Sequence, residues 1–501
     1  MHSRLKRWLY LLHRWLGIVM CAFFVMWFAS GVVMMYVGYP RLTAAERLQH
    51  LPSLDPAAPL LGPAQALAAA GIPSMPQDLR LSAASAGRPV YLATLADGSR
   101  IGAPVAIDAA TGTMLRAIDA AHALASAAAY AGGGVQAHYA GLVHEDAHTH
   151  SRALDPHRPL HRVQLDDEAG TLLYISSRTG EVVRDAPRTE RTWNYAGAWI
   201  HWLYPFRGNL FDRHWAAIVD GLSIAGIAVA LTGTVVGLLR WRFARPYRSG
   251  SRSPYRAGMM RWHHLAGLAF ALTTLTWIFS GLMSMNPWGV FGSGRGGPAV
   301  AAVYGHTGAM PAGAASVQML LARGGDIREL RWVHRLGREL VLAYGPAGRP
   351  ALLDARTARA VGLDPGELRH AAAGLVAAPL ARIQVLDRYD LHYYDRAPHT
   401  MTGGGNKPLP VWRIEFDDPA ATWVHLDPYT GSVLNSTDRS RRASRWLFAM
   451  LHSWDWLPLL EHRPLWDAVL ILFSLGGLAL SLTGLVIGWR RLRLSRRSFR
   501  A

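Results

Sequence analysis

The stretch HRWLGIVMCAFFVMWFASGVVMM, from His13 to Met35, returns 250 positions later as HHLAGLAFALTTLTWIFSGLMSM, from His263 to Met285. Histidine, glycine, tryptophan and a Ser-Gly pair keep their places in both copies. The region from about 160 to 240 recurs in the same way 251 positions later, with matched histidines at His201 and His452. A repeat of this length is not a solenoid unit, so the sequence predicts two related half-proteins.

Four segments are long and apolar enough to cross a bilayer, which takes about 20 residues. They are Leu9–Val37, Trp215–Leu239, Trp262–Met285 and Trp466–Trp489. The first is interpreted as an uncleaved anchor, because its apolar run is too long for a signal peptide and lacks a small-x-small cleavage site. The expected fold is a membrane protein with four transmembrane α-helices in two pseudo-symmetric halves, each with an external α+β region.

This interpretation divides the chain into eight parts. The transmembrane helices are expected in 1–37, 214–240, 262–286 and 464–490, the external regions in 38–213 and 287–463, and the internal segments in 241–261 and 491–501.

The basic residues predict the orientation. The net charge is +18, and the arginines and lysines of residues 1–14, 240–261 and 490–501 lie in segments without a single acidic residue. Four spans place these three segments on one side, which the positive-inside rule assigns to the cytoplasm, together with both termini. The excess charge therefore indicates topology and contact with anionic lipids rather than nucleic-acid binding.

Other motifs exclude several classes of chemistry. The single cysteine, Cys21, allows no disulfide within the chain and no Cys-x-x-Cys-His attachment of haem. The chain also lacks a Rossmann Gly-x-Gly-x-x-Gly, a Walker loop and a His-Glu-x-x-His zinc motif. A nicotinamide or flavin would have to be bound by another protein.

The external regions contain a recurrent turn that follows a β-forming run. It reads DAATG at 108–112, SSRTG at 176–180, DARTA at 354–358 and DPYTG at 427–431. The aspartate can cap such a turn and the glycine supplies positive φ, so each copy predicts a hairpin, less firmly where Ser176 and Ala358 depart from the pattern. Strands are expected at 339–344 and 412–416, with short helices at 64–70 and 316–322.

These features together resemble one family. His13-Arg-Trp-Leu-Gly17, the Asp-x-x-Thr-Gly turns, Tyr389-Asp-Leu-His-Tyr-Tyr394 before Pro408-Leu-Pro410, and the Leu-Thr-Gly in each even-numbered span are similar to the PepSY-associated transmembrane family. The resemblance implies a bacterial inner-membrane protein with four spans and two periplasmic PepSY-like regions. It further implies a likeness to haem-carrying reductases of ferric siderophores, without fixing the substrate.

Matched histidines at the cytoplasmic membrane ends are the first candidate site. His13 lies one turn inside the first span, and His263 and His264 occupy the same place in the third; a spacing of 250 selects His263, and 251 selects His264. A lone histidine there is more often an interfacial residue. The symmetric match favours a haem iron held by two imidazoles from facing helices.

His201 and His452 form the second candidate pair, on the external side and in aromatic surroundings. An aromatic belt explains the tryptophans and tyrosines without a cofactor but explains the matched histidines less well. We expect two non-covalent b-type haems, one held by His13 with His263 or His264 and the other by His201 with His452. His214 has no histidine counterpart and is a substitute ligand or a surface residue. The glycines of the second and fourth spans are most simply explained by helix packing.

Two further clusters are weaker candidates. His138, His144, His148, His150, His157 and His161 are concentrated in a segment expected to be loop-like, for which solvated histidines are a better explanation than a metal site. In the second half, Tyr389, Tyr393, Tyr394, His392 and His399 would suit a bulky, oxygen-rich ferric chelate.

The leading functional hypothesis is a transmembrane electron conduit that reduces a periplasmic ferric siderophore, with an unidentified cytoplasmic or quinol donor. One alternative is a PepSY-type binding or regulatory protein with a membrane anchor and no redox activity. A siderophore or iron permease is a further alternative, disfavoured because no span is visibly broken in the sequence.

Overall fold

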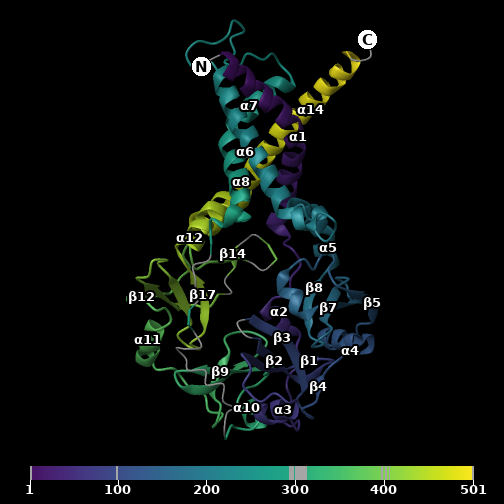
Figure 1. The fold of residues 1–501 in the computed structure, drawn as a ribbon, viewed down its shortest axis with the longest axis vertical. Coiled ribbons are helices and arrows are strands. Elements are labelled where there is room, and N and C mark those ends of the chain that lie inside the picture. The colour runs from purple at the N-terminus through teal and green to yellow at the C-terminus, as the bar shows by residue number, and fades with distance from the viewer. Residues whose placement is uncertain are drawn as a thin grey trace.

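The computed structural model describes residues 3–97, 100–292, 298–299, 313–396, 399–400, 403–404 and 407–498. The molecule is elongated, with a helical bundle at one end and β-sheets at the other (Figure 1). Within these described residues, three helices are long and apolar enough to cross a membrane: α1 (Ser3–Tyr36), α6 (Trp215–Arg240) and α14 (Leu465–Ser498).

The third predicted span is not one straight helix. It consists of α7 (Met259–Ala269) and α8 (Ala271–Ser284), bent by 66° at Phe270, and makes a fourth span only if the bent pair crosses as a unit. The ring of Phe270 packs on Gly476 of α14, where a Cβ would lie 2.2 Å from it. Its counterpart Met20 lies within the continuous α1. The bend accompanies a contact with a distant helix. The hydrophobic pattern of residues 262–285 therefore did not predict it.

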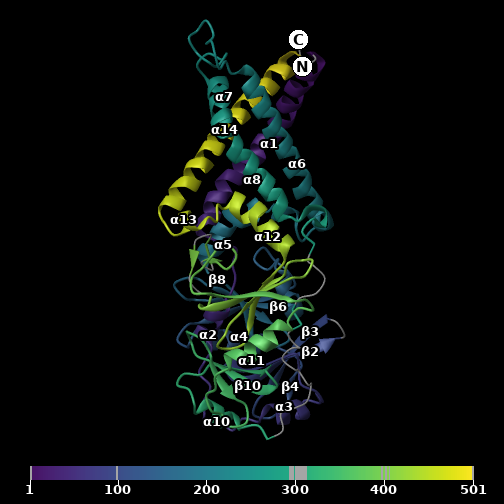
Figure 2. The ribbon, with the colours of Figure 1, turned by 90° about the vertical axis from the view of Figure 1, so that its left-hand side faces the viewer.

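The three basic segments lie together. The start of α1, the 241–258 connection between α6 and α7, and the end of α14 all occupy the end of the bundle that is far from the sheets (Figures 1 and 2). The predicted separation of the basic segments from the folded β-rich regions is therefore present in the fold.

The two halves share one sheet at the far end of the molecule. Its order is β11-β10-β9-β1-β2-β3-β4. The strands are β1 (Asp78–Ser85), β2 (Arg88–Asp97), β3 (Arg100–Asp108), β4 (Met114–Leu115), β9 (Glu329–Arg335), β10 (Arg338–Tyr344) and β11 (Ala351–Asp354). The central antiparallel pair, β1 and β9, places Arg80 opposite Arg331. The external regions of the two halves are thus joined by backbone hydrogen bonds.

Each half also has a sheet of its own closer to the bundle. The first has the order β5-β6-β7-β8 and the second β12-β15-β16-β17. They comprise β5 (Ala137–Val143), β6 (Leu160–Leu165), β7 (Leu172–Ser176), β8 (Val182–Ala186), β12 (Leu380–Leu386), β15 (Val411–Phe416), β16 (Trp423–Leu426) and β17 (Val433–Thr437). A short ribbon pairs β13 (Asp395–Arg396) with β14 (Gly403–Gly404).

Short helices complete the external part. Helix α4 (Ala120–Tyr130) packs on the first of these sheets, with Ala123 and Ala127 buried in a core beside Val163 and Leu173. Helix α11 (Pro365–Ala373) buries Leu368 against the second. The others are α2 (Ala44–His50), α3 (Pro63–Ala69), α5 (Arg188–Asn194), α10 (Val317–Leu321), α12 (Arg439–Arg445) and α13 (Leu457–Leu460). The helices predicted at 64–70 and 316–322 correspond to α3 and α10.

All four predicted turns form. Gly112, Gly180 and Gly431 have φ of 75°, 71° and 66°, and Ala358 takes the same position with φ of 55°. The carboxylate of Asp108 accepts from the backbone of Thr111 at 3.0 Å, and the hydroxyl of Ser176 accepts from Thr179 at 3.3 Å. The side-chain cap and the backbone path are therefore retained where the sequence departs from Asp and Gly.

Candidate functional site

The inner histidine pair lies at the basic end of the bundle. His13 on α1 and His263 on α7 face each other with ring centres 6.3 Å apart and planes tilted by 37°. Nδ1 of His13 lies 3.3 Å from the carbonyl of Val229, and Nδ1 of His263 lies 3.2 Å from the carbonyl of Leu480. The two acceptors occupy matching positions on α6 and α14, so the pseudo-symmetry extends to the hydrogen bonds.

His264 points elsewhere. Its Nδ1 lies 2.7 Å from the hydroxyl of Ser253, its Nε2 lies 2.9 Å from the carbonyl of Gly237, and the side chain is buried. Both ring nitrogens are engaged in fixing the 241–258 connection to α6. Of the two alternatives that the repeat spacing left open, the structure brings His263 to His13.

The outer pair lies where the bundle meets the sheets. His201 and His452 have ring centres 6.2 Å apart and planes at 81°. Nδ1 of His201 lies 2.9 Å from the hydroxyl of Ser30, and Nδ1 of His452 lies 3.0 Å from that of Ser280. These serines belong to the Ser-Gly pairs that match between α1 and α8, so the motif supplies a hydrogen-bond partner to each histidine.

A π-helical turn precedes each outer histidine. The turns are η2 (Tyr195–Trp199) and η6 (Trp446–Met450), at the same spacing as the histidines themselves. Gly197 inside η2 has a non-helical backbone and packs closely on Val33 of α1. π-Helical turns are rare in proteins, and those that occur often lie at functional sites. Sequence reasoning missed both, because a π-turn has no distinct hydrophobic period.

The hydrogen bonds fix the same tautomer on all four rings. A carbonyl can only accept, so Nδ1 of His13 and of His263 carries the proton. Ser30 donates its own hydroxyl proton to the carbonyl of Met26 at 2.7 Å, and Ser280 donates to Trp277 at 2.9 Å. Both serines therefore accept from Nδ1 of the outer histidines. Each Nε2 keeps its lone pair, and among the described residues none of the four forms a hydrogen bond through Nε2.

Two glycines hold the inner rings closely. A Cβ at Gly233 would lie 2.6 Å from Cε1 of His13. At the matching Gly484, it would lie 3.1 Å from Cε1 of His263 and 2.5 Å from the sulfur of Cys21. Gly221, also on α6, has nothing within 4 Å of such an atom. The Leu-Thr-Gly motif therefore makes room for the imidazoles as well as for helix packing.

The two pairs are well separated. Along α1, the 17 residues from His13 to Ser30 correspond to about 25 Å. Aromatic side chains occupy the interior between them, with the rings of Phe28 and Trp277 5.8 Å apart. One group cannot contact both pairs, so the bundle contains two candidate centres.

The remaining sequence candidates do not gather into a site. His214 is exposed and lies 2.9 Å from Arg213. Parts of the segment predicted to be a loop are strands β5 and β6, and its histidines have separate partners: His138 pairs with Asp166, His150 with Glu145, and His161 with the carbonyl of Ile118. Within the described ranges, no group of three or more His, Cys, Asp or Glu side chains could hold a metal ion.

The tyrosine-rich loop of the second half is partly buried. Tyr393 is fully buried and stacks on His425 with ring centres 4.9 Å apart. Tyr389 donates to the carbonyl of Lys407 at 2.8 Å. His399 forms ion pairs across to the first half, with Glu46 at 2.5 Å and Glu190 at 3.1 Å. His399 therefore links the two halves, whereas Tyr389 and Tyr393 contact residues of the second half, and a chelate-binding role for this loop stays a prediction.

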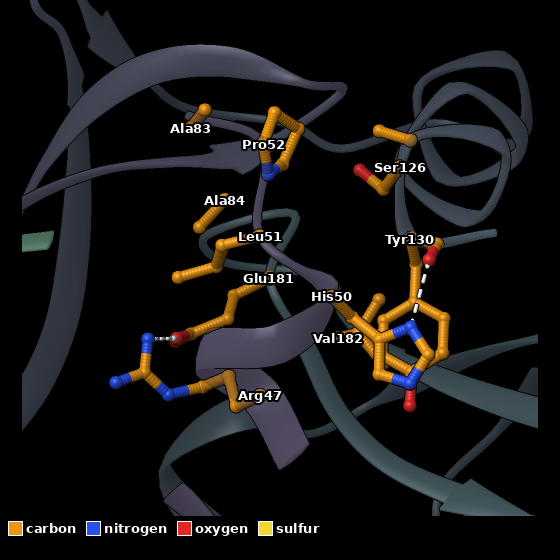
Figure 3. Close-up of a pocket in the computed structure, with 11 residues that line it drawn as sticks. Arg47, His50, Leu51, Pro52, Ala83, Ala84, Ser126, Tyr130, Glu181 and Val182 are labelled. Carbon is orange, nitrogen blue, oxygen red and sulfur yellow. Dashed lines mark hydrogen bonds and ion pairs between the residues drawn. The ribbon is translucent and has the colours of Figure 1, made fainter. Parts of the chain in front are cut away.

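A small cavity in the β-rich part of the molecule is lined by side chains that bond to one another. Arg47, His50, Tyr130 and Glu181 are among its lining, and Nδ1 of His50 lies 3.0 Å from the carbonyl of Tyr130 (Figure 3). Burial alone would raise the pKa of Glu181, but Arg80 and Arg47 outweigh it and lower the pKa to about 2. Glu181 is thus a buried carboxylate held ionised by its partners.

Comparison with known proteins identifies one family. Residues 10–359 match the family model described as the PepSY-associated TM region. The match includes the inner histidines and His201, but ends before His452. No curated protein matches the chain.

Proposed function

Because the chain belongs to the PepSY-associated transmembrane family, we propose that this membrane protein carries two b-type haems and passes electrons across the bacterial inner membrane to a periplasmic ferric siderophore. The observation that carries the proposal is the matched tautomer of the four facing histidines. Metal-binding histidines usually donate one ring N–H to a nearby acceptor and bind through the other nitrogen. His13, His263, His201 and His452 all have this arrangement.

The spacing of the rings fits the donor chemistry. Two imidazoles that share one metal ion through bonds of about 2.0–2.1 Å have ring centres roughly 6–6.5 Å apart. The separations are 6.3 Å for the inner pair and 6.2 Å for the outer pair. Each pair would hold one haem iron, and the absence of covalent attachment motifs implies b-type haem.

Haem at both ends would supply one-electron transfer along the bundle. The protein's own groups would orient the axial imidazoles and exclude water. The carbonyls of Val229 and Leu480 orient the inner imidazoles, and Ser30 and Ser280 orient the outer ones. Hydrogen bonds donated by Nδ1 raise the basicity of an axial imidazole, and the apolar bundle excludes water; both influence the reduction potential.

The substrate step follows from ligand hardness. One electron converts the bound Fe(III) of the chelate to Fe(II), and no bond within the siderophore has to break. Hard oxygen donors hold Fe(III) far better than Fe(II), so reduction weakens binding and releases the metal. The electron would come from a cytoplasmic or quinol donor at the inner pair.

The proposed orientation places both termini and the 241–258 connection in the cytoplasm. The support is the gathering of the three acid-free basic segments at one end of the bundle. The sheets and the outer histidines would then face the periplasm. A reporter active only in the periplasm should be inactive when fused after residue 501 and active when inserted at Gly348 between β10 and β11; the opposite pattern would reverse the orientation.

The bend in the third span favours a second candidate. Broken membrane helices mark the substrate sites of many transporters. The 66° bend at Phe270 therefore removes the earlier argument against a siderophore or iron permease. A permease would move the chelate itself, whereas a conduit moves only electrons.

Reconstitution in sealed vesicles separates the candidates. Vesicles with a reductant inside and a ferric siderophore outside should produce external Fe(II), trapped by an impermeant chelator, while a radiolabelled siderophore stays outside. Entry of the label without Fe(II) outside would establish the permease. A protein that binds no haem and does neither would be a PepSY-type binding or regulatory protein.

A further inference from the structure

Buried polar atoms without a hydrogen-bond partner gather beside His452. Within the described residues, these are Nε1 of Trp277, the hydroxyl of Ser453, Oδ2 of Asp455 and Nη2 of Arg445. Ser453 and Asp455 are 5% and 1% exposed, and Asp455 lies three residues after the histidine. Trp277 is tied to the pair because Nδ1 of His452 lies 3.2 Å from its carbonyl. Buried polar groups are normally satisfied, so this concentration needs an explanation.

The matched positions of the first half are different. Nε1 of Trp27, the counterpart of Trp277, donates to the carbonyl of His201 at 3.0 Å. The positions of Ser453, Asp455 and Arg445 are taken by residues without formal charge, Trp202, Tyr204 and Asn194. Oδ1 of Asn194 is also buried without a hydrogen-bond partner, but it can only accept. The cationic, donor-rich surroundings therefore belong to the second-half side of the outer pair.

The charge of this cluster favours an anion. Asp455 forms ion pairs with Arg396 and, at 3.7 Å, with Nη2 of Arg445. One buried carboxylate thus faces two guanidinium groups, which leaves one positive charge in excess. Three of the four unsatisfied groups, those of Trp277, Ser453 and Arg445, can donate. A carboxylate only accepts and binds best to such donors.

We propose that this cluster binds the propionate carboxylates of the haem held by His201 and His452. The proposal rests on the proposed function and deepens it. The haem would lie asymmetrically in a pseudo-symmetric bundle, with its carboxylate edge toward the second half. Arg445, Ser453 and Trp277 would donate to the propionates, and Asp455 would be a positioning residue that holds Arg396 and Arg445 in place.

A phospholipid phosphate could supply the same kind of anion. The burial of Ser453 and Asp455 favours haem, as does the interior place of Trp277, whose ring lies 5.8 Å from Phe28 and 6.3 Å from Trp454. A headgroup at the rim of the bundle would not reach between these rings.

The test combines a protein change with a ligand change. The full chain, with His13 and His263 both replaced by alanine to leave only the outer pair, is made in haem-deficient cells and titrated with haem or with haem dimethyl ester. Removing a charge-assisted hydrogen bond weakens binding by about tenfold or more. We expect that loss for Arg445→Gln with haem and for the parent with the ester. The two changes together should add little, because they remove the same contact.

Matched variants control for folding. Arg442→Gln removes an arginine from the same helix, where its guanidinium lies 4.0 Å from the Trp423 ring centre and donates to the carbonyl of Ala421 at 2.7 Å. It should leave haem affinity unchanged. Arg445→Lys keeps the charge and should recover most of the affinity. The low-spin spectrum should persist in every variant, because the axial histidines remain.

Three outcomes decide the proposal. Equal affinity of the parent for haem and its ester would overturn it, and so would fully additive losses. Loss of bound phospholipid from Arg445→Gln with unchanged haem affinity would assign the cluster to lipid instead. If the wild-type chain with all four histidines binds no haem, the proposed function itself fails, which is a distinguishable result.

Discussion

The two halves of the molecule have nearly the same histidine environments but different surroundings. In both, a bundle helix supplies a histidine at one end and a serine at the other, and a π-turn delivers a second histidine to that serine. The first half keeps α1 continuous, whereas the second bends its counterpart at Phe270 and collects charged residues beside His452. The shared part fits the proposed pairs of axial ligands, and the differing part is where the two halves depart from symmetry.

The largest expected effect, on haem content and on chelate reduction, comes from replacing a single histidine of either pair. If each pair holds its own haem, His13→Ala should lower the haem-to-protein ratio by about half, and His452→Ala should do the same. A five-coordinate, high-spin haem that stays bound is an equally acceptable result, because one axial imidazole remains. Either variant should abolish reduction of an external ferric chelate, since the two centres act in series. Haem content and absorbance spectra check this.

The outer haem centre would be refuted if His201 and His452 could both be replaced without any change in spectrum, haem content or chelate reduction. His264→Ala is the matched control for the inner pair. It should leave the haem spectrum unchanged, because both of its nitrogens are engaged in protein contacts.

A smaller effect is expected from the glycine that packs on His13. Gly233→Ala places a methyl group where the ring stands, so the ring must shift and the inner centre should lose low-spin character. Gly221→Ala, on the same helix but facing open space, should be silent. Electron paramagnetic resonance of the oxidised protein distinguishes the centres; an unaltered spectrum for Gly233→Ala would show that the ring is not confined there.

The central strands of the shared sheet allow a comparison of stability. Arg80 pairs with Glu181 and Glu329, whose side chains are 5% and 4% exposed, whereas its counterpart Arg331 pairs with the more exposed Asp78. Arg80→Met should destabilise the external part by about 3 kcal/mol, because it leaves two buried carboxylates to share Arg47, which lies 2.6 Å from Glu329 and 3.8 Å from Glu181. Arg331→Met should have an effect of about 1 kcal/mol or less. Equal shifts in thermal unfolding would contradict the difference in burial.

The smallest effect concerns the pairing of the halves by His399. The carboxylate of Glu190, with that of Glu46, raises the pKa of His399 to about 9. Because the folded pKa lies above the usual 6.5, the stabilisation is complete below about pH 6.5 and is lost as the pH rises through 9. His399→Gln should flatten the pH dependence of melting between these values. A profile that is unchanged in the variant would show that the ion pairs contribute nothing to stability.

Much of the fold follows from the repeat. Matching His13 with His263 and His201 with His452 predicted which helices would approach each other, because pseudo-symmetry relates whole surroundings and not single residues. The turn signature also held at Ser176 and Ala358, where the serine hydroxyl replaces the aspartate and the alanine accepts positive φ. Local hydrogen bonding was enough to define these turns.

Other features depend on distant contacts and could not be predicted. The bend at Phe270 accompanies packing on Gly476, about 200 positions away, and the choice of His263 over His264 depends on Ser253 and Gly237. The inward orientation of Tyr393 results from stacking on His425. Apart from Ser253, these partners lie outside the window of about 11–18 residues in which hydrophobic periodicity is informative.

The central claim is that each facing pair of histidines holds one haem. The most direct measurement is the haem stoichiometry and absorbance spectrum of the full chain, purified in detergent from cells supplied with haem. We expect two b-type haems per chain, both with low-spin, bis-histidine spectra. A colourless protein would contradict the account, and a single haem that survives replacement of either pair would contradict the assignment of its ligands.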